Sequence, residues 1–111
     1  AIASIIKDTK FFYSGSLALS YQPMTLDQAG LSDTIYPQLL SIDSVRVVVF
    51  LKEKEDHFEI GFRAKRGYDL DVGERASKLG DGGHKLAAGA SYTAKRDELE
   101  NIIVNLFKEI L

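Results

Sequence analysis

The stretch VRVVVFLKEKEDHFEIGFRA, residues 45–64, contains two strand patterns on either side of a charged turn. In its first half Val, Phe and Leu fill both alternating sets of positions, which predicts a strand that is buried on both faces. In its second half apolar residues alternate with polar or small ones. The apolar set is Phe58, Ile60, Phe62 and Ala64. Because successive side chains of a strand point to opposite faces, this pattern predicts a β-hairpin with Arg63 on the face opposite the core.

The residues before this hairpin predict helices and one further strand. A run of Ile side chains in residues 1–6 indicates the end of a helix, and the aromatic and aliphatic residues 11–20 predict a strand around Gly15. Pro23 should end that strand. Thr25 can cap a short helix over residues 25–29 that Gly30 stops, and a second helix is expected over residues 33–41 with Pro37 in its first turn.

The residues after the hairpin predict a helix, a strand and a final helix. Asp71 and Glu74 form a capping-box pattern for a helix over residues 72–79, which Gly80 should end. The small residues in AAGASY, residues 87–92, predict a strand. Thr93 can cap an amphipathic C-terminal helix with one apolar stripe: Leu99, Ile102, Ile103, Leu106, Phe107 and Ile110. Together these elements predict an α+β domain with a mixed β-sheet that is covered by helices on at least one face.

Length and composition are typical of one globular domain. The chain has 111 residues, of which 45% are hydrophobic and 27% charged, so a disordered tail is excluded. Cysteine is absent, which makes a cytoplasmic setting the expectation and excludes disulfides and thiolate chemistry. The first ten residues have the pattern of neither a signal peptide nor a membrane anchor, and without a starting Met we expect that a segment was removed upstream.

The charged residues are distributed unevenly along the chain. The net charge is −2, yet residues 61–96 carry eight Lys and Arg against four Asp and Glu, which makes that block +4. Its positive charge therefore coincides with the cluster of glycines at residues 80–89. A basic, glycine-rich segment is a candidate for binding a phosphorylated partner.

The run GDGGHKLAAG, residues 80–89, carries the most specific chemical signal. Glycines allow backbone N–H groups to converge on a phosphate oxygen, and His84 and Lys85 would add side-chain donors. The same run also fits a tight connection between a helix and a strand, with Gly80 ending the helix and Asp81 and Gly82 in a turn. The residues by themselves leave both interpretations open.

Catalytic residues are not predicted in this chain. Its two histidines lie far apart in the sequence, and His57 beside Asp56 in a charged turn is interpreted as a surface residue. Neither an Asp/His cluster for a pair of metal ions nor a Ser/His/Asp arrangement is present in the sequence. Tyr68 and Tyr92 flank the glycine run and could stack on bases, although core packing is the commoner role of tyrosine.

The run GDGGHKLAAG resembles the GGGHxxAAG signature of the DHH-associated domain. That domain follows the catalytic DHH domain in nanoRNases, cyclic dinucleotide phosphodiesterases, exopolyphosphatase-like proteins and RecJ exonucleases. FRAK at residues 62–65 stands where the family has a pattern like SLRSK. Asp81 occupies a position that is usually glycine and places a carboxylate beside the expected phosphate site, while Ala64 replaces a frequent serine and removes a hydroxyl donor. The resemblance implies substrate and phosphate binding by Arg63, Gly82, Gly83 and His84, with Lys65 and Lys85 as weaker candidates.

The resemblance further implies that residues 1–111 form the substrate-binding domain of a metal-dependent phosphoesterase. Manganese, or magnesium, and the catalytic residues would belong to an upstream DHH domain, so this chain alone is expected to be inactive. The implied partners are that DHH domain and a nucleotide, a short oligonucleotide or another phosphoester, with no membrane involved. Two alternatives are an RNA-binding module like the C-terminal domain of alanyl-tRNA synthetases, and a structural domain that forms homodimers. The histidine and the AAG of the signature argue against the first alternative.

Overall fold

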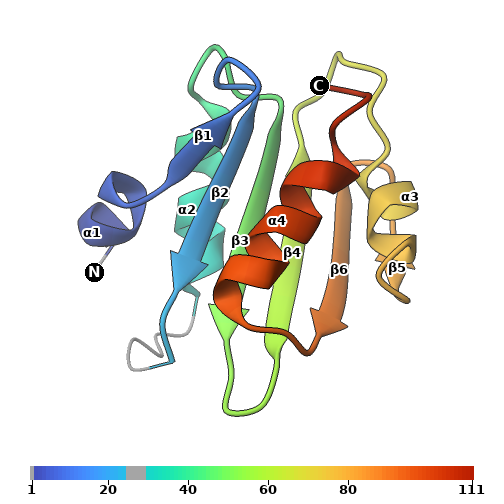
Figure 1. Cartoon of the computed structure of the whole chain (residues 1–111). Helices are drawn as coiled ribbons and strands as arrows, with labels where there is room; N and C mark the ends of the chain where they lie inside the picture. The colour runs from blue at the N-terminus through green and yellow to red at the C-terminus, as the bar shows by residue number, and fades with distance from the viewer. Residues whose placement is uncertain (1, 25–29) are drawn as a thin grey trace.

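The computed structural model describes residues 2–24 and 30–111, and its described strands form one mixed sheet. The six strands lie in the order β1-β2-β3-β4-β6-β5 (Figure 1). They are β1 Lys10–Phe12, β2 Leu17–Gln22, β3 Val47–Glu53, β4 Phe58–Ala64, β5 Gly82–Gly83 and β6 Ala87–Tyr92. The strands β2 and β3 pair in parallel, whereas all other neighbours pair antiparallel. The prediction of an α+β domain with a mixed sheet is confirmed.

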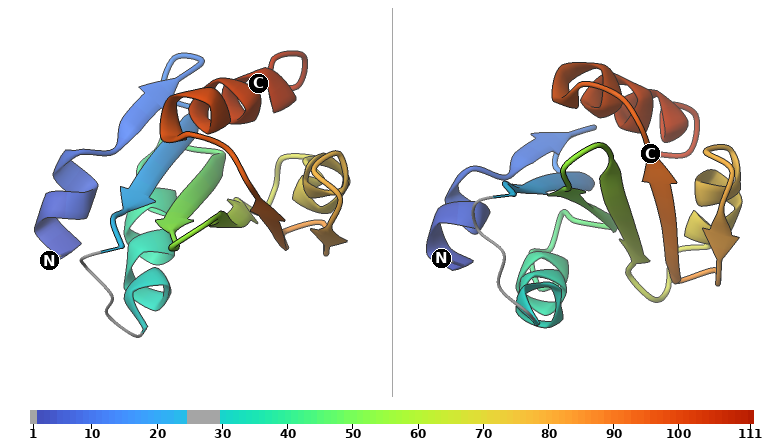
Figure 2. Two further views of the ribbon diagram at one scale, coloured as in Figure 1. Left: turned by 60° about the horizontal axis from the view of Figure 1, so that its bottom comes forward. Right: turned by 90° about the horizontal axis from the view of Figure 1, so that it is seen from below.

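Four helices in the described part of the chain cover the sheet unequally. They are α1 Ile2–Lys7, α2 Leu31–Leu40, α3 Val72–Ser77 and α4 Arg96–Leu106. One face of the sheet packs against α3 and α4, through a core that includes Phe62, Ile103 and Phe107. The other face packs against α2, mainly over β2 and β3 (Figure 2). The strand β3 contributes to both cores, and residues 47–51 are fully buried, as the apolar pattern predicts.

The segment 11–20 differs from its prediction as a single strand. It forms the antiparallel pair β1 and β2, joined by a turn in which Tyr13, Ser14 and Gly15 all have positive φ, at 55°, 58° and 88°. The Tyr13 hydroxyl donates a hydrogen bond to the carbonyl of Val104 in α4. This contact between segments far apart in the sequence helps to hold two non-glycine residues in the left-handed region, which local propensity disfavours.

Two helix starts also differ from their predictions. The helix α2 begins at Leu31 and has Gly30 as its N-cap, so Gly30 begins a helix and Pro37 lies in its interior. Pro37 lacks the amide that would donate to the carbonyl of Asp33, a cost that the apolar packing of this helix offsets. The helix α4 has Lys95 as its N-cap in place of Thr93, with Asp97 and Glu98 stabilising the first turn through the helix dipole. The helix expected over residues 25–29 lies outside the described residues.

The capping prediction for α3 is confirmed. The carboxylate of Asp71 accepts a hydrogen bond of 3.0 Å from the backbone amide of Glu74. After Ser77 the chain turns, and Gly80 with φ of 99° occupies the left-handed conformation that ends the segment. The predicted strand at 87–92 is β6.

A polar cluster joins α4 to the edge of the sheet. The side chain of Glu100 is 11% exposed and accepts hydrogen bonds from Lys10 Nζ at 2.7 Å and Arg96 Nε at 3.0 Å. The guanidinium of Arg96 lies 3.6 Å from the centroid of the Tyr21 ring. The Tyr21 hydroxyl donates to Glu53 at 2.9 Å, so the cluster links α4, β1, β2 and β3.

Replacing Glu100 by glutamine is expected to reduce the loss of stability in acid. Burial alone would raise the pKa of Glu100, but the hydrogen bonds from Lys10 and Arg96 outweigh it and lower this pKa below 4.5. A carboxyl group whose pKa is depressed on folding adds stability above its unfolded pKa and loses it as pH falls through the folded pKa. Glu100→Gln should therefore lower the free energy of unfolding by about 1 kcal/mol at pH 7 and by almost nothing at pH 2. The loss at pH 7 is small because Lys10 is half exposed, so that solvent screens its charge. Urea denaturation at both pH values measures the difference, and an equal cost at both would contradict the role of the charge.

Candidate functional site

The face of β4, β6 and β5 that points away from α3 and α4 is open. In Figure 2 α2 lies beside β2 and β3, and no described helix covers β6 or β5 on that side. The side chains on this face belong to the residues that alternate with the buried ones of β4 and β6. Their cross-strand register arranges them in three rows, because directly paired residues project their side chains to the same face.

The first row, here the arginine row, consists of Arg63, Ala87 and His84. Arg63 in β4 pairs with Ala87 in β6. Ala87 and His84 exchange both backbone hydrogen bonds, at 2.7 and 3.3 Å, so His84 extends the same row at the end of β5. Two strand spacings separate Arg63 from His84, about 10 Å between backbones, and only the methyl group of Ala87 stands between them. The expectation that Arg63 and His84 emerge on one face agrees with this register.

Arg63 is supported by an aromatic ring from α2. Its guanidinium lies 4.5 Å from the centroid of the Tyr36 ring and donates a hydrogen bond to the carbonyl of Phe62 at 2.9 Å. Tyr36 is 8% exposed and packs edge-on against Phe50. Burial raises the pKa of Tyr36 to about 12, partly offset by the charge of Arg63, so its hydroxyl stays protonated at ordinary pH. Arg63 thus stacks on a fixed ring and does not pair with Glu59, the alternative role for a strand arginine.

The second row, here the glycine row, consists of Gly61, Gly89 and Gly82. Gly61 pairs with Gly89, and Gly89 pairs with Gly82, so three glycines lie side by side across β4, β6 and β5. A Cβ on Gly61 would lie 1.9 Å from the Tyr36 hydroxyl, which therefore occupies the place of the missing side chain. Beside the Tyr36 hydroxyl, the surface over Gly89 and Gly82 carries no side chains.

The third row, here the acidic row, contains Glu59 and Ser91, and Lys52 of β3 pairs with Glu59 on its other side. The Asp81 carboxylate joins it by accepting a hydrogen bond of 2.8 Å from the Ser91 amide. A cavity of about 190 Å³ is lined by Arg63, Tyr36, Lys52 and Glu59, among others, and a second one of about 340 Å³ by Glu59, Asp81, Gly89 and Ser91. Because Asp81 is held at the acidic row, its carboxylate is directed away from the arginine row, where the sequence interpretation had placed it.

The glycines of GDGGH form a strand and not an open loop. Gly82 and Gly83 are the two residues of β5. Since hydrogen-bonded pairs alternate along an antiparallel ladder, the His84–Ala87 pair implies that the amide of Gly82 also bonds to β6. Gly83 faces α3, where Gly73 approaches its carbonyl closely. The short connection considered from the sequence is present in part, because Gly80 has a left-handed φ of 99° whereas Gly82 lies in β5 and not in a turn. The amide of His84 is used within the sheet, and the ladder pattern implies the same for that of Gly82.

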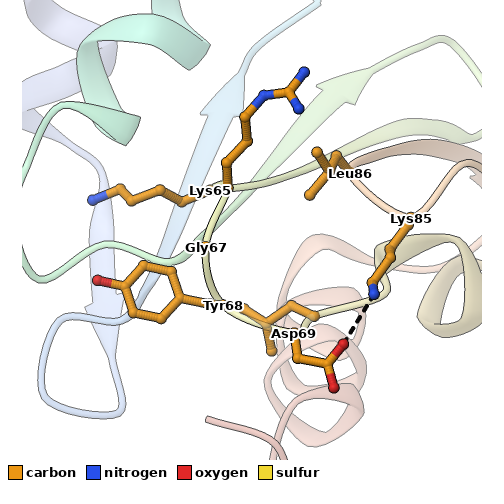
Figure 3. Close-up of a pocket in the computed structure, with 8 residues that line it drawn as sticks. Lys65, Gly67, Tyr68, Asp69, Lys85 and Leu86 are labelled. Atoms are coloured by element: carbon orange, nitrogen blue, oxygen red, sulfur yellow. Dashed lines mark hydrogen bonds and ion pairs between the residues drawn. The ribbon is translucent and has the colours of Figure 1, made fainter.

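Lys65 and Lys85 lie in a separate basic pocket of about 270 Å³ beyond the end of β4 (Figure 3). The basic pocket is lined by Lys65, Arg66, Gly67, Tyr68, Asp69, Leu70, Lys85 and Leu86. Lys85 pairs with Asp69 at 2.9 Å, and Lys65 donates to the carbonyl of Ile42 at 2.8 Å. The hydrogen bond and charge of Lys85 hold the pKa of Asp69 below its usual value. The structure thus separates these two lysines from the arginine row.

Sequence patterns did not identify several residues of the open face as members of the site. Tyr36 lies 27 positions before Arg63, and no local pattern connects them. The pairing of Gly61 with Gly89 is also set by strand register, although both glycines interrupt strand patterns, which signals close backbone approach. Tyr68 lines the basic pocket beneath the Arg46 guanidinium, at 4.5 Å, while Tyr92 pairs with Phe58 at the opposite end of β4.

Metal ligands and membrane spans were searched in the described residues. Within residues 2–24 and 30–111, no three His, Cys, Asp or Glu side chains lie together in a way that could hold a metal ion. His57 contacts Asp56 at 2.7 Å in the turn between β3 and β4. No helix in these two ranges has the length and apolar character needed to span a membrane.

Comparison with protein families gives one match over most of the chain. A family model described as the DHHA1 domain matches residues 24–111. A curated relative, the bifunctional oligoribonuclease and PAP phosphatase NrnA of Bacillus subtilis (strain 168), is 28% identical over 106 residues. That alignment covers 92% of this chain and 33% of the relative, so the chain spans about a third of the relative's length.

Two solved structures share the fold. An exopolyphosphatase-related protein from Bacteroides fragilis superposes with a TM-score of 0.86 at 18% identity, covering 97% of this chain and 33% of that one. The C-Ala domain of alanyl-tRNA synthetase from Aquifex aeolicus superposes with a TM-score of 0.62 at 15% identity, covering 87% of this chain and 95% of that one. The fold is therefore shared with an exopolyphosphatase-related protein and with a synthetase domain.

Proposed function

This chain belongs to the DHHA1 domain family, and we propose that it is the substrate-binding domain of a metal-dependent phosphoesterase. Its substrate is a nucleotide or short oligonucleotide, whose phosphate it holds against a catalytic DHH domain that lies outside residues 1–111. The similarity to an oligoribonuclease and PAP phosphatase supports this proposal. Because the described residues hold no cluster of metal ligands, the manganese or magnesium ions of such an enzyme would be bound by the DHH domain.

The observation that carries this proposal is the arginine row. Arg63 and His84 lie on one open face, with a side chain no larger than the methyl of Ala87 between them. A guanidinium stacked on a ring is already ordered, so it loses less entropy when it grips a phosphate through two N–H groups. The imidazole of His84 is exposed and can donate to the same phosphate from the opposite side.

The other candidate residues support the arginine row in different ways. Gly82 and Gly83 keep β5 compact, so that the chain can return to β6 with His84 at the end of the row. Lys65 and Lys85, in the basic pocket, add positive potential that attracts a phosphorylated ligand. With the phosphate held in this way, the domain would orient the scissile bond toward the metal ions, which lowers the barrier through positioning.

Replacing Arg63 by alanine is expected to weaken binding of the dinucleotide pApA by about 1.5 to 3 kcal/mol, the range for a hydrogen bond to a charged group. His84→Ala should weaken it by a similar amount, and neither change should alter the unfolding midpoint much, because both side chains reach the surface. Isothermal titration of the 111-residue chain with pApA measures the effect.

Arg66→Ala is the matched control, because Arg66 is an exposed arginine three positions later that lines the basic pocket and not the arginine row. It should change the affinity for pApA by less than threefold. Equal losses in the Arg63 and Arg66 variants would indicate diffuse attraction by positive charge and would contradict a phosphate site at the arginine row.

A further inference from the structure

The cavity of about 190 Å³ over β4 has α2 as its wall, and His84 does not line it. Tyr36 and Lys52 line it together with Arg63, so side chains from α2, β3 and β4 meet there. We propose that this cavity, here the α2 cavity, is a separate site for a phosphate-sized oxyanion, bound by the Tyr36 hydroxyl with Lys52 and Arg63. It goes beyond the proposed function, which needs one phosphate held between Arg63 and His84.

The Tyr36 hydroxyl is the observation that points to a ligand. Tyr36 is 8% exposed, and its hydroxyl lies over Gly61 in the wall of the α2 cavity. Within residues 2–24 and 30–111, no group forms a hydrogen bond with this hydroxyl. A polar group on a buried side chain is normally paired, because an unpaired one costs free energy. Burial raises the pKa of Tyr36 to about 12, so the hydroxyl keeps its proton and can donate.

The groups around this hydroxyl are donors, so the partner it lacks is an acceptor. Arg63, stacked on the Tyr36 ring, carries only N–H donors and uses one of them on the carbonyl of Phe62. Lys52 likewise has only donors, and its Nζ lies 5.7 Å from the centroid of the Phe50 ring, against which Tyr36 packs edge-on. A phosphate can accept from all three side chains through different oxygens.

Glu59 is the acidic residue in the wall of the α2 cavity. Its carboxylate lies 3.8 Å from Nε2 of His57, near the turn that joins β3 to β4. Lys52 is its cross-strand partner and places a positive charge beside it. Lys52 and Arg63 therefore set two positive charges against one negative charge in this wall. Ser32, in the first turn of α2, adds a hydroxyl near the positive end of the helix dipole, which also favours an anion.

NMR titration of the 111-residue chain with inorganic phosphate tests this proposal, because two amides report the two sites separately. The Gly61 amide reports the α2 cavity, and the Ala87 amide reports the arginine row. Tyr36→Phe keeps the ring that supports Arg63 and removes only the hydroxyl. It should weaken the affinity measured at Gly61 about tenfold, the loss of one hydrogen bond to a charged group. The affinity measured at Ala87 should change less than about twofold.

Four further variants complete this experiment. Lys52→Met should weaken the affinity at Gly61 about threefold, since solvent screens its charge. His84→Ala should weaken the affinity at Ala87 and leave that at Gly61 unchanged. Tyr92→Phe is the matched control, because Tyr92 lies on the face that packs against α4, and it should change neither affinity. Arg63→Ala should weaken both, since Arg63 belongs to both sites.

The outcomes distinguish the α2 cavity from the arginine row. If phosphate does not shift the Gly61 amide, or if Tyr36→Phe leaves the affinity there unchanged, the α2 cavity is not a phosphate site. Equal losses at Gly61 and Ala87 in the Tyr36 variant would indicate a single site and would also overturn the proposal. So would a fall of its thermal midpoint by more than about 3 °C, because the hydroxyl would then have a partner in the fold. If His84→Ala leaves the affinity at Ala87 unchanged, the arginine row fails, whatever the Tyr36 variant does.

Discussion

Gly83→Ala is expected to destabilise the domain by about 3 kcal/mol, at the upper end of the usual cost of overpacking, whereas Gly82→Ala should change stability by less than about 0.5 kcal/mol. The two glycines are neighbours in β5, so the comparison holds position and chemistry nearly constant. A Cβ on Gly83 would lie 2.6 Å from Ala88 Cα and 2.8 Å from the Ala87 carbonyl oxygen, both backbone atoms of the paired strand. Relief would require β5 and β6 to separate.

The helix α3 also packs closely against β5. A Cβ on Gly73 would lie 2.6 Å from the Gly83 carbonyl oxygen and 2.9 Å from that of His84. Gly73→Ala should therefore cost a similar amount by pushing α3 away from β5. Urea denaturation of the three variants, followed by circular dichroism, measures these costs. A Gly83 variant as stable as the Gly82 variant would show that the tight contact between α3, β5 and β6 is not required.

Gly61→Ala is expected to destabilise the domain by about 2 kcal/mol, and Tyr36→Phe should restore most of that loss in the double variant. A Cβ on Gly61 would lie 1.9 Å from the Tyr36 hydroxyl but 3.2 Å from the ring carbon that carries it. Without the hydroxyl oxygen, the remaining contact needs a shift of only a few tenths of an ångström. Tyr36 cannot rotate away freely, because its ring is packed against Phe50 and beneath Arg63.

A double-mutant cycle measures this coupling. The free energy of unfolding of wild type, Gly61→Ala, Tyr36→Phe and the double variant should give an interaction energy of at least 1 kcal/mol. Binding of pApA supplies a second readout, because displacement of Tyr36 also moves the support of Arg63. Gly61→Ala should weaken binding by more than Tyr36→Phe does, and the double variant should lie between them. Additive costs would contradict the contact between the hydroxyl and Gly61.

Local patterns predicted most elements because each depends on nearby residues. The alternation at 58–64 identified the buried and exposed faces of β4, and Asp71 was correctly identified as the cap of α3. Residues 11–20 were wrongly predicted as one strand because their turn depends in part on Tyr13 bonding to Val104, 91 positions away. The start of α4 was misplaced by a few residues, since Lys95 caps it through backbone geometry without a side-chain hydrogen bond.

The sequence by itself determined that this is an α+β domain, that Arg63 faces away from the core, and that GDGGHKLAAG carries the family's signature, because period, composition and motif are properties of contiguous residues. Only the tertiary structure decided which residues share a row. Strand order and register bring Gly61, Gly89 and Gly82 side by side, place Tyr36 over the first of them, and direct Asp81 to the acidic row. These juxtapositions join strands up to 28 positions apart, and they depend on the packing of whole elements, which no local pattern encodes.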